Sequence, residues 1–416
     1  MSSVSLFIVP STAESQSASV DVGQKDADAE RILGPTAADI VASTGQKPNE
    51  GKRDWDLSVE ADVARYLAST PFACTSIKAL SGGTANFVYR LTLDQPYKGH
   101  KALVLKHGKG FVKNSPEFAL DLARQKFEVE ALRHVFAWLP SDWLVRVPEV
   151  HLFDENENVI IMDDTGKDSM NLKDYLQKGM ASTETARIIG TELGRFLGAL
   201  HSWGKSNVDI QKAVSGNVQG KAIKAMYYYG GLKPTLDGSA KVPFLSDPTL
   251  DVSPEDMQVV EQISAETMQA IQEANGAFVM GDFWPGNVMI NVEAGQVKHI
   301  MVIDWELSKE GILGIDIGQF AAELHLLRQC NPETSKETAT VALDSFLAGY
   351  KQERQPTSED ARRAICHLGA HMIILGARVA WGPKEISRRV VLEGVRILVD
   401  GSKTSELDKT LIGGLI

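Results

Sequence analysis

Hydrophobic residues follow two different spacings along this chain. Before residue 165 they gather in short runs, such as Ala102–Leu105 and Val159–Met162, which are typical of buried strands. After residue 185 they recur at the offsets of one helix face, at Ile189, Leu193, Phe196, Leu197 and Leu200. The pattern therefore predicts an α+β chain with a β-rich first half and a mainly helical second half.

The same pattern places the individual elements. Strands are expected on both sides of a glycine turn within residues 79–91, and then at 102–106, 159–162, 278–280, 288–291 and 297–303. Helices are expected at 62–69, 121–138 and 189–201, and through most of the chain after residue 317. Residues 1–52 show little periodicity and are rich in small and polar residues, so we predict a disordered N-terminal tail.

Composition narrows the class of protein. The 416 residues carry a net charge of −11 and show no basic stretch, which argues against a nucleic-acid partner. Cys74, Cys330 and Cys366 are far apart and form no CxxC pair, which fits a reducing compartment. No apolar run is long enough to span a membrane, and Val4–Pro10 lacks the basic flank of a signal peptide. We expect a cytoplasmic protein without a membrane partner.

The strongest chemical signal is the run Met280-Gly-Asp-Phe-Trp-Pro-Gly-Asn, which is followed by a strand that ends at Asp304. Transfer of a γ-phosphoryl group needs an oriented hydroxyl, metal ions between the phosphates and neutralised charge. Asp282 can accept and aim the hydroxyl proton, while Asn287 and Asp304 offer hard oxygen ligands for Mg²⁺. An Asp and an Asn five residues apart can also merely cap a turn, but the adjoining strand and Asp304 favour catalysis. Glu306 is either a further metal or acceptor contact or a solvated loop residue.

A second signal is the glycine turn between the first two predicted strands. Gly82, Gly83 and Asn86 can bring backbone N–H groups close to phosphates, although a plain hairpin has the same appearance. Lys106 ends an apolar strand about 20 residues later, where it can reach the α and β phosphates or simply snorkel to solvent. Its carboxylate partner is expected on the helix at 121–138, where Glu128 is preferred and Glu130 is the alternative.

Other residues support this site or lie near it. Backbone groups around Asp163, in the connector at residues 162–164, are expected to meet the adenine. Asp316 is expected to tie down the loop of Asp282 or to cap a helix, and His201 to be a core residue. The acceptor pocket is expected to form after residue 185 and to include some of Tyr227–Tyr229, Glu306, His325 and Trp381, unless these residues are core.

The chain resembles the aminoglycoside phosphotransferase and choline kinase superfamily over about residues 60–400, and within it the methylthioribose-kinase-like branch. The motifs that suggest the branch are Leu80-Ser-Gly-Gly with Asn86, Tyr89-Arg, Pro96-Tyr-Lys-Gly-His, Leu105-Lys-His, Val279-Met before Asp282, and Asp304-Trp-Glu-Leu. One departure is Met280, since much of the superfamily has His at this position to support the loop.

The resemblance implies a two-lobed protein-kinase-like fold that uses ATP and Mg²⁺. The N-lobe is expected at residues 53–164 and the C-lobe at 165–416. Asp282 would be the catalytic residue, Asn287 and Asp304 would hold metal, and Lys106 with Glu128 would position ATP. Glu306 fits the Asp-x-Glu pattern of the branch.

The acceptor is expected to be a hydroxyl of a small soluble metabolite. A protein kinase has Lys where this chain has Trp284, and an Ala-Pro-Glu segment that is missing after Asp304. A choline or ethanolamine kinase stays open as an alternative. So does a non-catalytic nucleotide-binding module, although the joint presence of Asp282, Asn287, Asp304 and Lys106 argues against it.

Overall fold

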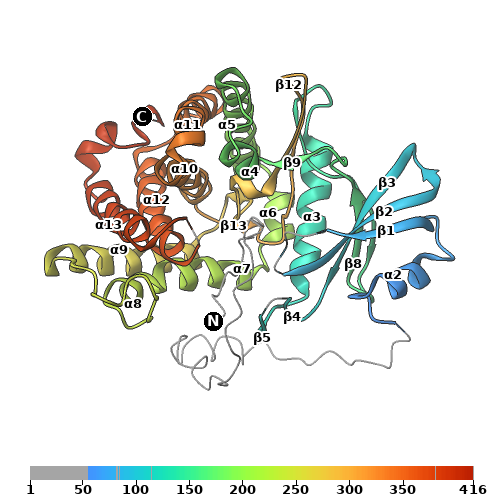
Figure 1. The fold of residues 1–416 in the computed structure, drawn as a ribbon, viewed down its shortest axis with the longest axis horizontal. Helices are drawn as coiled ribbons and strands as arrows, with labels where there is room; N and C mark the ends of the chain where they lie inside the picture. The colour runs from blue at the N-terminus through green and yellow to red at the C-terminus, as the bar shows by residue number, and fades with distance from the viewer. Residues whose placement is uncertain (1–54, 81–82, 84, 114, 380, 416) are drawn as a thin grey trace.

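The chain forms a β-rich lobe and a helical lobe that meet along the middle of the molecule (Figure 1). The computed structural model describes residues 55–80, 83, 85–113, 115–379 and 381–415. The tail expected at residues 1–52 and Gly82 lie outside these described residues. The α+β class expected from the hydrophobic pattern is confirmed.

The first lobe is built around one antiparallel sheet of five strands in the order β1-β2-β3-β8-β7. Its elements are α2 (Glu60–Leu67), β1 (Cys74–Ala79), β2 (Asn86–Tyr97), β3 (His100–Gly108), α3 (Ala123–Trp138), β7 (Val150–Asp154) and β8 (Val159–Asp163). A two-stranded ribbon, β4 (Phe111–Val112) with β5 (Ser115–Ala119), precedes α3.

Side chains alternate between the two faces of this sheet, and the alternation places Lys106. Leu103 and Leu105 of β3 pack into the cluster that includes α2, whereas Val104 packs into the cluster that includes α3. Successive residues of a strand point to opposite faces, so Lys106 shares the face of Val104 and points toward α3. The strand period therefore predicts that this lysine faces α3, the helix that carries Glu128. Figure 1 shows α3 beside the sheet.

The second lobe is mainly helical, and its core is continuous with α3 and its side of the N-lobe sheet. Its helices are α4 (Leu172–Gln177), α5 (Thr183–Ser206), α6 (Val208–Val214), α7 (Val218–Ile223), the π-helix η2 (Lys224–Gly230), α8 (Leu232–Leu236), α9 (Pro254–Glu273), α10 (Leu313–Cys330), α11 (Pro332–Glu353), α12 (Ser358–Arg378) and α13 (Lys384–Gly401). Short 3₁₀ turns lie at η3 (Pro285–Asn287), η4 (Thr404–Lys409) and η5 (Gly413–Leu415).

Small β elements carry the segments that bear the expected chemistry. A four-stranded sheet has the order β6-β12-β11-β9, from β6 (Val145–Arg146), β12 (Gln296–Val302), β11 (Val288–Glu293) and β9 (Met170–Asn171). A two-stranded piece pairs β10 (Phe278–Val279) with β13 (Lys309–Glu310). All the expected strands and helices therefore appear, with ends that differ by a few residues.

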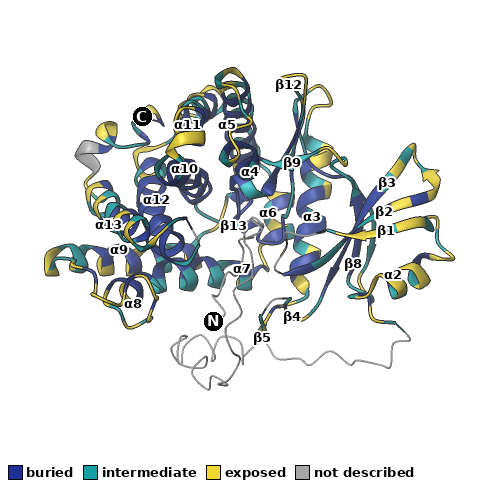
Figure 2. Ribbon diagram, viewed as in Figure 1, coloured by how far each residue is buried: buried dark blue, intermediate teal, exposed yellow. Residues whose placement is uncertain are grey.

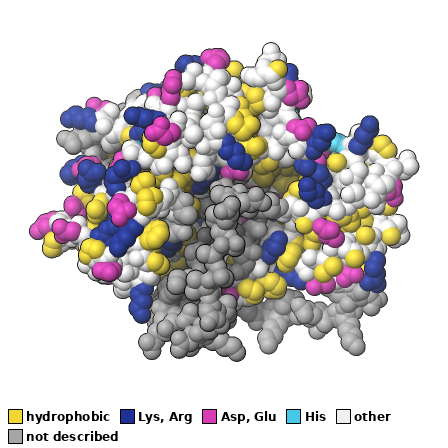
Figure 3. All heavy atoms as spheres, viewed as in Figure 1, with side chains coloured by type: hydrophobic (Ala, Val, Ile, Leu, Met, Phe, Trp, Pro, Cys, Tyr) yellow, Lys and Arg dark blue, Asp and Glu magenta, His cyan; other side chains and the backbone are white. Residues whose placement is uncertain are grey.

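Burial is greatest where the two lobes meet (Figure 2). Exposed residues lie on the outer edges of the sheet and on the outer helices, while the elements that meet in the middle are buried or half-buried (Figure 2). On the face shown in Figure 3, basic and acidic side chains intermingle over the part of the chain that is described. Among the described residues, none of the helices has the length and apolar character needed to cross a membrane.

Candidate active site

The loop between β10 and β11 folds back on itself and brings Asn287 to Asp282. The turn of η3 is closed by a backbone hydrogen bond from Asn287 N to Trp284 O. The Asn287 side-chain Nδ2 then donates to the Asp282 backbone oxygen at 3.1 Å and to Asp282 Oδ2 at 3.0 Å. Ile303 N donates to Asn287 O, so the strand that leads to Asp304 lies directly beside this loop.

Asp282 is a nearly buried carboxylate with further donors of its own. Trp284 Nε1 donates to Asp282 Oδ2 at 3.2 Å, and Gln319 Nε2 donates to Asp282 Oδ1 at 2.6 Å. Burial raises the pKa of Asp282, and the charge of Asp304 raises it further, while Lys224 and the hydrogen bonds oppose the rise. The carboxylate is therefore held in one orientation by residues from two separate parts of the chain.

Gln319 and Lys224 are site residues that the sequence pattern did not reveal. Lys224 Nζ donates to Gln319 Oε1 at 2.6 Å, so a buried ammonium, an amide and the Asp282 carboxylate form one chain of hydrogen bonds. Lys224 starts the π-helix η2, and such departures from α-helical winding occur mainly at functional sites. These hydrogen bonds fix the orientation of the Asp282 side chain.

Asp316 anchors the backbone of the same loop, as expected from the sequence. Its two carboxylate oxygens accept hydrogen bonds from Met280 N at 2.9 Å and Gly281 N at 3.0 Å. His201 Nε2 lies 3.5 Å from Asp316 Oδ2, and its Nδ1 lies 2.9 Å from the Tyr350 hydroxyl. The backbone of this loop is therefore held by α10, and His201 lies behind the Asp316 carboxylate.

Lys106 and Glu128 form the expected ion pair, at 2.7 to 2.8 Å between Nζ and the carboxylate oxygens. Glu130, the alternative partner, is one-third exposed and lies near Arg133 instead. Lys106 also pairs with Asp304 and lies 3.9 Å from Glu306. Three carboxylates from two lobes therefore surround one lysine.

Burial and charge act against each other in this cluster. Burial lowers the pKa of Lys106, but the charges of Asp304, Glu128 and Glu306 outweigh it and leave the pKa raised. Burial raises the pKa of Glu128, and the Lys106 charge opposes that rise. Asp304 behaves in the same way. The cluster holds more carboxylates than cations, which suits a place where further cations bind.

Glu306 and Asn86 belong to a second cluster, which is centred on Arg124. Arg124 donates to Glu306 Oε2 at 3.1 Å and to Asn86 Oδ1 at 3.0 Å, and Asn86 Nδ2 donates to Glu306 Oε2 at 2.9 Å. Burial raises the pKa of Glu306, but Lys106, Arg124 and these hydrogen bonds lower it more. The cluster joins the start of β2 and the start of α3 to the segment after β12.

The carboxylates differ in how open they are to the space between the lobes. The Asp304 side chain is 33% exposed, whereas those of Glu128 and Glu306 are 1% and 3% exposed. Asp304 also has a φ of 66°, an uncommon value for a residue other than glycine that is often found at functional sites.

Asn287 uses its Nδ2 within the loop, which leaves its Oδ1 as a ligand atom. The hard oxygens of Asn287 and Asp304 therefore fit Mg²⁺.

Gly83 and Asp163 are the other described residues expected at the nucleotide site. Gly83 is exposed in the turn between β1 and β2. The Asp163 backbone N–H donates to Glu149 O, and the Asp163 side chain contacts His151. The Asp163 amide N–H is therefore already used, and contact of this residue with an adenine stays a prediction.

A third group lies beside Trp284 at the C-lobe side. Lys173 Nζ lies 4.0 Å from the centre of the Trp381 ring and 5.4 Å from that of Trp284, and it pairs with Glu323 at 2.8 Å. Trp381 was expected near the acceptor. His325 and Glu306 were also expected there, but His325 pairs with Glu393 of α13 and Glu306 with Arg124, so neither lies in this group.

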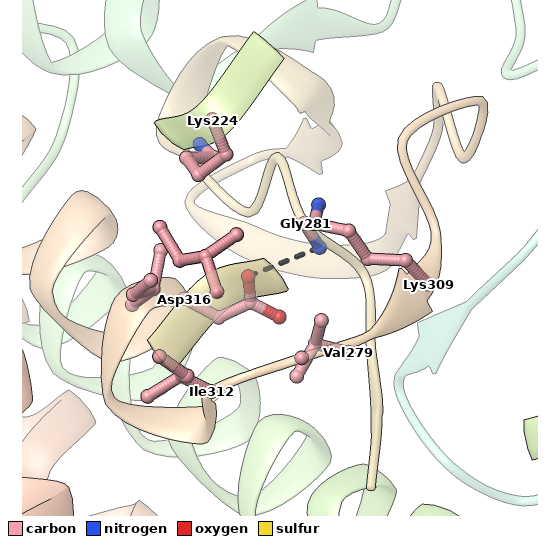
Figure 4. A pocket seen from close by; sticks show the side chains of 9 residues that line it. Lys224, Val279, Gly281, Lys309, Ile312 and Asp316 are labelled. Carbon is pink, nitrogen blue, oxygen red and sulfur yellow. Dashed lines mark hydrogen bonds between the residues drawn. The ribbon is translucent and has the colours of Figure 1, made fainter. Parts of the chain in front are cut away.

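A small cavity lies under the loop that leads to Asp282 (Figure 4). The cavity has a volume of about 10 Å³, measured as the space open to the centre of a water molecule. Its lining includes Lys224, Lys309 and Asp316. One buried water needs about this much room, so the cavity is too small for a metabolite. Burial, with the charge of Lys224, lowers the pKa of Lys309 to about 7.

One pattern in the sequence could have indicated Gln319 and Glu323 as site residues. Asp316, Gln319 and Glu323 are spaced by three and four residues in an otherwise apolar stretch, so they share one face of α10. We call these three residues the polar stripe of α10. They contact the loop backbone, Asp282 and Lys173 respectively. Arg124, Lys173 and Lys224 carry no comparable signal.

Comparisons with known proteins agree with this chemistry. The phosphotransferase enzyme family matches residues 76–327. A 4-hydroxytryptamine kinase of Psilocybe cubensis is 28% identical over 374 residues, 86% of this chain and 98% of that protein. A methylthioribose kinase of Geobacillus sp. is 25% identical over 300 residues, 69% of this chain and 68% of that protein. Because the family match spans more than half of the chain, the protein belongs to the phosphotransferase enzyme family.

Proposed function

We propose that this protein is an ATP-dependent kinase that transfers the γ-phosphoryl group of ATP to a hydroxyl of a small molecule. The observation that carries the proposal is the hydrogen bonding of Asp282. A carboxylate offers about four lone-pair sites, and three are filled by Gln319, Trp284 and Asn287. The remaining site, on Oδ1, suits the hydroxyl of an acceptor.

Asp282 would then act by orientation. Phosphoryl transfer has a loose transition state, so catalysis rests on positioning and on charge stabilisation more than on covalent chemistry by the protein. A carboxylate that three donors hold in place can accept the hydroxyl hydrogen bond and aim the oxygen without first having to rotate. The hydrogen bonds from Gln319 to Asp282 and from Lys224 to Gln319 maintain that orientation.

The nucleotide would lie on the other side of the same space. Lys106, held by Glu128, is the cation placed to meet phosphate oxygens, and Asp304 is the exposed carboxylate beside it. Asn287 and Asp304 would hold Mg²⁺, which neutralises charge between the phosphates when it is bound. Glu306 would act through Arg124, by fixing the segment that carries Asp304. Two 4-hydroxytryptamine kinases are similar to this chain over 98% and 92% of their lengths, which supports ATP as the donor.

The acceptor would lie against Trp284, because this side chain touches Asp282 and faces the group formed by Lys173 and Trp381. A cation over an aromatic face is attracted to it, and here Lys173 already occupies that position over Trp381. Lys173 also pairs with Glu323, so a second cation next to the reacting hydroxyl would find neither a free Trp381 face nor an unpaired carboxylate in this group. We infer that the part of the acceptor near its hydroxyl is uncharged.

This inference bears on the choline and ethanolamine alternative. In both molecules the charged nitrogen is separated from the hydroxyl by a short two-carbon link, so it must lie close to Trp284 and Lys173. In methylthioribose no such charge is present. In 4-hydroxytryptamine the ethylamine chain is attached next to the ring hydroxyl, so its ammonium can reach that hydroxyl. The site therefore favours an uncharged acceptor of the methylthioribose kind.

The test is a panel of acceptors offered with Mg²⁺ and ATP, with phosphate transfer followed by mass. Methylthioribose, 4-hydroxytryptamine, choline, ethanolamine and an aminoglycoside cover the classes. We expect phosphorylation of an acceptor that is uncharged near its hydroxyl. Turnover of choline or ethanolamine alone would contradict the acceptor class. Labelling of a protein substrate, with no transfer to any small molecule, would overturn the small-molecule kinase.

A further inference from the structure

Two histidines and the Asp163 carboxylate meet at the margin of the N-lobe sheet, in a group separate from that of Glu128, Asp304 and Glu306. His100 begins β3, His151 lies in β7, and Asp163 ends β8. In the sheet order β3 and β7 flank β8, so three neighbouring strands each contribute one side chain. None of the three has an assigned role toward a metal.

The backbone holds these side chains in place. His100 follows a two-residue hairpin, in which Tyr97 pairs with His100 and both Lys98 and Gly99 have positive φ. Such a turn sets the pairing of Tyr97 with His100, and the register of β2 with β3 shifts between Thr92 and Tyr97. Asp163 Oδ2 accepts a hydrogen bond from Glu149 N at 3.1 Å. This bond leaves Asp163 Oδ1 to face the two imidazole rings.

The distances among the ligand atoms suit one ion. Asp163 Oδ1 lies 2.9 Å from His151 Nε2 and 3.6 Å from His100 Nδ1, and one ligand atom from each residue lies within 4.8 Å of the others. A tetrahedral Zn²⁺ with ligands at 2.0–2.1 Å keeps its ligand atoms roughly 3.3 Å apart. The observed separations lie on either side of that value, so small side-chain rotations would complete the geometry.

The surroundings also resemble the outer shell of a metal site. The His151 side chain is fully buried, and its Nδ1 has no hydrogen-bond partner within the described part of the chain. That nitrogen faces Glu149 Oε1 at 3.7 Å. Metal-bound histidines commonly donate their other N–H to a carboxylate, which fixes the ring and raises its basicity. His100 is 39% exposed and gives an ion access from solvent.

We propose that His100, His151 and Asp163 form a binding site for a divalent transition-metal ion, with Zn²⁺ the best fit. Two imidazole nitrogens and one carboxylate oxygen suit Zn²⁺, whereas Mg²⁺ prefers oxygen ligands. Three protein ligands leave one coordination position for water. The ion would join the ends of β3, β7 and β8 where the chain leaves the sheet for the C-lobe. The proposal does not depend on the phosphotransferase activity.

Titration of the chelator-stripped full chain with Zn²⁺, followed by calorimetry, tests the site. We expect one tight site, a higher melting temperature with Zn²⁺, and visible absorption bands of tetrahedral Co²⁺ when Co²⁺ replaces Zn²⁺. His100→Ala should abolish the bands and the tight site while leaving the fold intact, because His100 is partly exposed. Glu149→Gln removes the carboxylate that faces His151 Nδ1, together with its ion pair to Lys98, and should weaken binding roughly 10–100-fold.

Two controls separate this site from others. His134→Ala removes a histidine of α3 outside the cluster and should leave Zn²⁺ affinity unchanged. Asp304→Asn alters the only other group of metal-ligating residues found in the described parts of the chain and should also leave the tight site in place. The proposal is overturned if no stoichiometric site is found, or if the tight site survives His100→Ala or is lost in Asp304→Asn.

Discussion

At the scale of single residues, Asp282 depends on a partner that lies 37 positions away in the chain. Gln319 fills one lone pair of Oδ1, and Lys224 holds Gln319 by its other amide atom. A terminal carboxylate rotates easily unless its oxygens are bonded, so these two residues decide where the free lone pair points. Neither residue needs to touch the substrate to affect the rate.

A double-mutant cycle tests this dependence. Gln319→Leu should lower kcat roughly 10²-fold, the order of loss expected from a misplaced reacting group, with little change in KM for ATP. Lys224→Met should lower kcat in the same direction. Because Lys224 acts through Gln319, the double variant should lose little more than Gln319→Leu alone.

Ser264→Ala is the matched control for this cycle. Ser264 Oγ donates to the Tyr229 backbone oxygen and so supports the same π-helix without touching Gln319 or Asp282. Its kcat should stay near that of the wild type. Fully additive losses for Gln319→Leu and Lys224→Met, or an equal loss for Ser264→Ala, would show that the π-helix matters only as a scaffold.

The Lys106 pair makes a second prediction at this scale. Glu128→Gln keeps the shape of the side chain but removes its charge, and a charge-assisted hydrogen bond contributes about 1.5–3 kcal/mol. We expect kcat/KM for ATP to fall on the order of 10–100-fold. Glu130→Gln lies on the same helix, away from Lys106, and should be silent. If steady-state kinetics gave the reverse order, Glu130 would be the functional partner.

At the scale of elements, the loop before Asp282 is held by backbone contacts that leave no room for a side chain. Gly281 has a φ of 83°, and a Cβ there would come within 2.2 Å of Lys309 Nζ and 2.3 Å of Leu307 O. Gly276 has a φ of 70°, but a Cβ there would meet nothing within 4 Å. The two glycines share the left-handed conformation and differ only in their packing.

The pair gives a controlled test of loop packing. Gly276→Ala should cost about 1–2 kcal/mol of unfolding free energy, because Ala resists the left-handed region. Gly281→Ala should cost clearly more and should also lower kcat, since the loop must move away from Leu307 and carry Asp282 with it. Urea denaturation and steady-state kinetics measure both effects. Equal costs with normal kcat in both variants would contradict the tight packing of the loop.

The elements also show which parts of the site a sequence can reveal. Asp282, Asn287 and Asp304 lie within 23 residues, in the loop after β10, in the turn η3 and just after β12, so their meeting follows from local geometry. The alternation of β3 likewise predicts the side on which Lys106 lies. In contrast, α10 is buried along nearly its whole length, so only its polar stripe distinguishes the face that meets the loop. The π-turn at Lys224 shifts the helix register, and no motif announces it.

At the scale of the whole molecule, charged residues join parts that are far apart in the chain. Arg124 links the N-lobe to the Asp304 segment through Glu306, and Lys173 links α4 to α10 through Glu323. Such long-range partners could not be predicted, because each residue alone resembles an ordinary surface charge. The lobe boundary expected after residue 164 and the tail at residues 1–52 stay predictions.

Glu323 makes the stability of the whole molecule depend on pH. Burial alone would raise the pKa of this carboxyl, but Lys173 and the hydrogen bond from His371 outweigh burial and lower the pKa from 4.5 to about 2. A lowered pKa stabilises the folded state above pH 4.5, and the stabilisation is lost as pH falls toward 2. The shift corresponds to about 3 kcal/mol at neutral pH.

Glu323→Gln tests this contribution. We expect a lower unfolding free energy at pH 7 and a weaker dependence of stability on pH between about 4.5 and 2 than in the wild type. Glu337→Gln removes an exposed carboxylate from α11 and should change neither quantity. Parallel pH curves for Glu323→Gln and the wild type would show that Glu323 is not held ionised by Lys173.

The most direct test of the central claim is the fate of the γ-phosphate of labelled ATP with wild-type protein and with Asp282→Asn. The substitution keeps size and nucleotide contacts but removes the charge that orients the acceptor hydroxyl. With Mg²⁺ and an acceptor from the panel, the wild type should move label into the small-molecule fraction. Asp282→Asn should bind nucleotide with unchanged affinity and lose transfer by about 10³-fold or more. Transfer at the wild-type rate by folded Asp282→Asn would contradict the assignment of Asp282 as the catalytic residue.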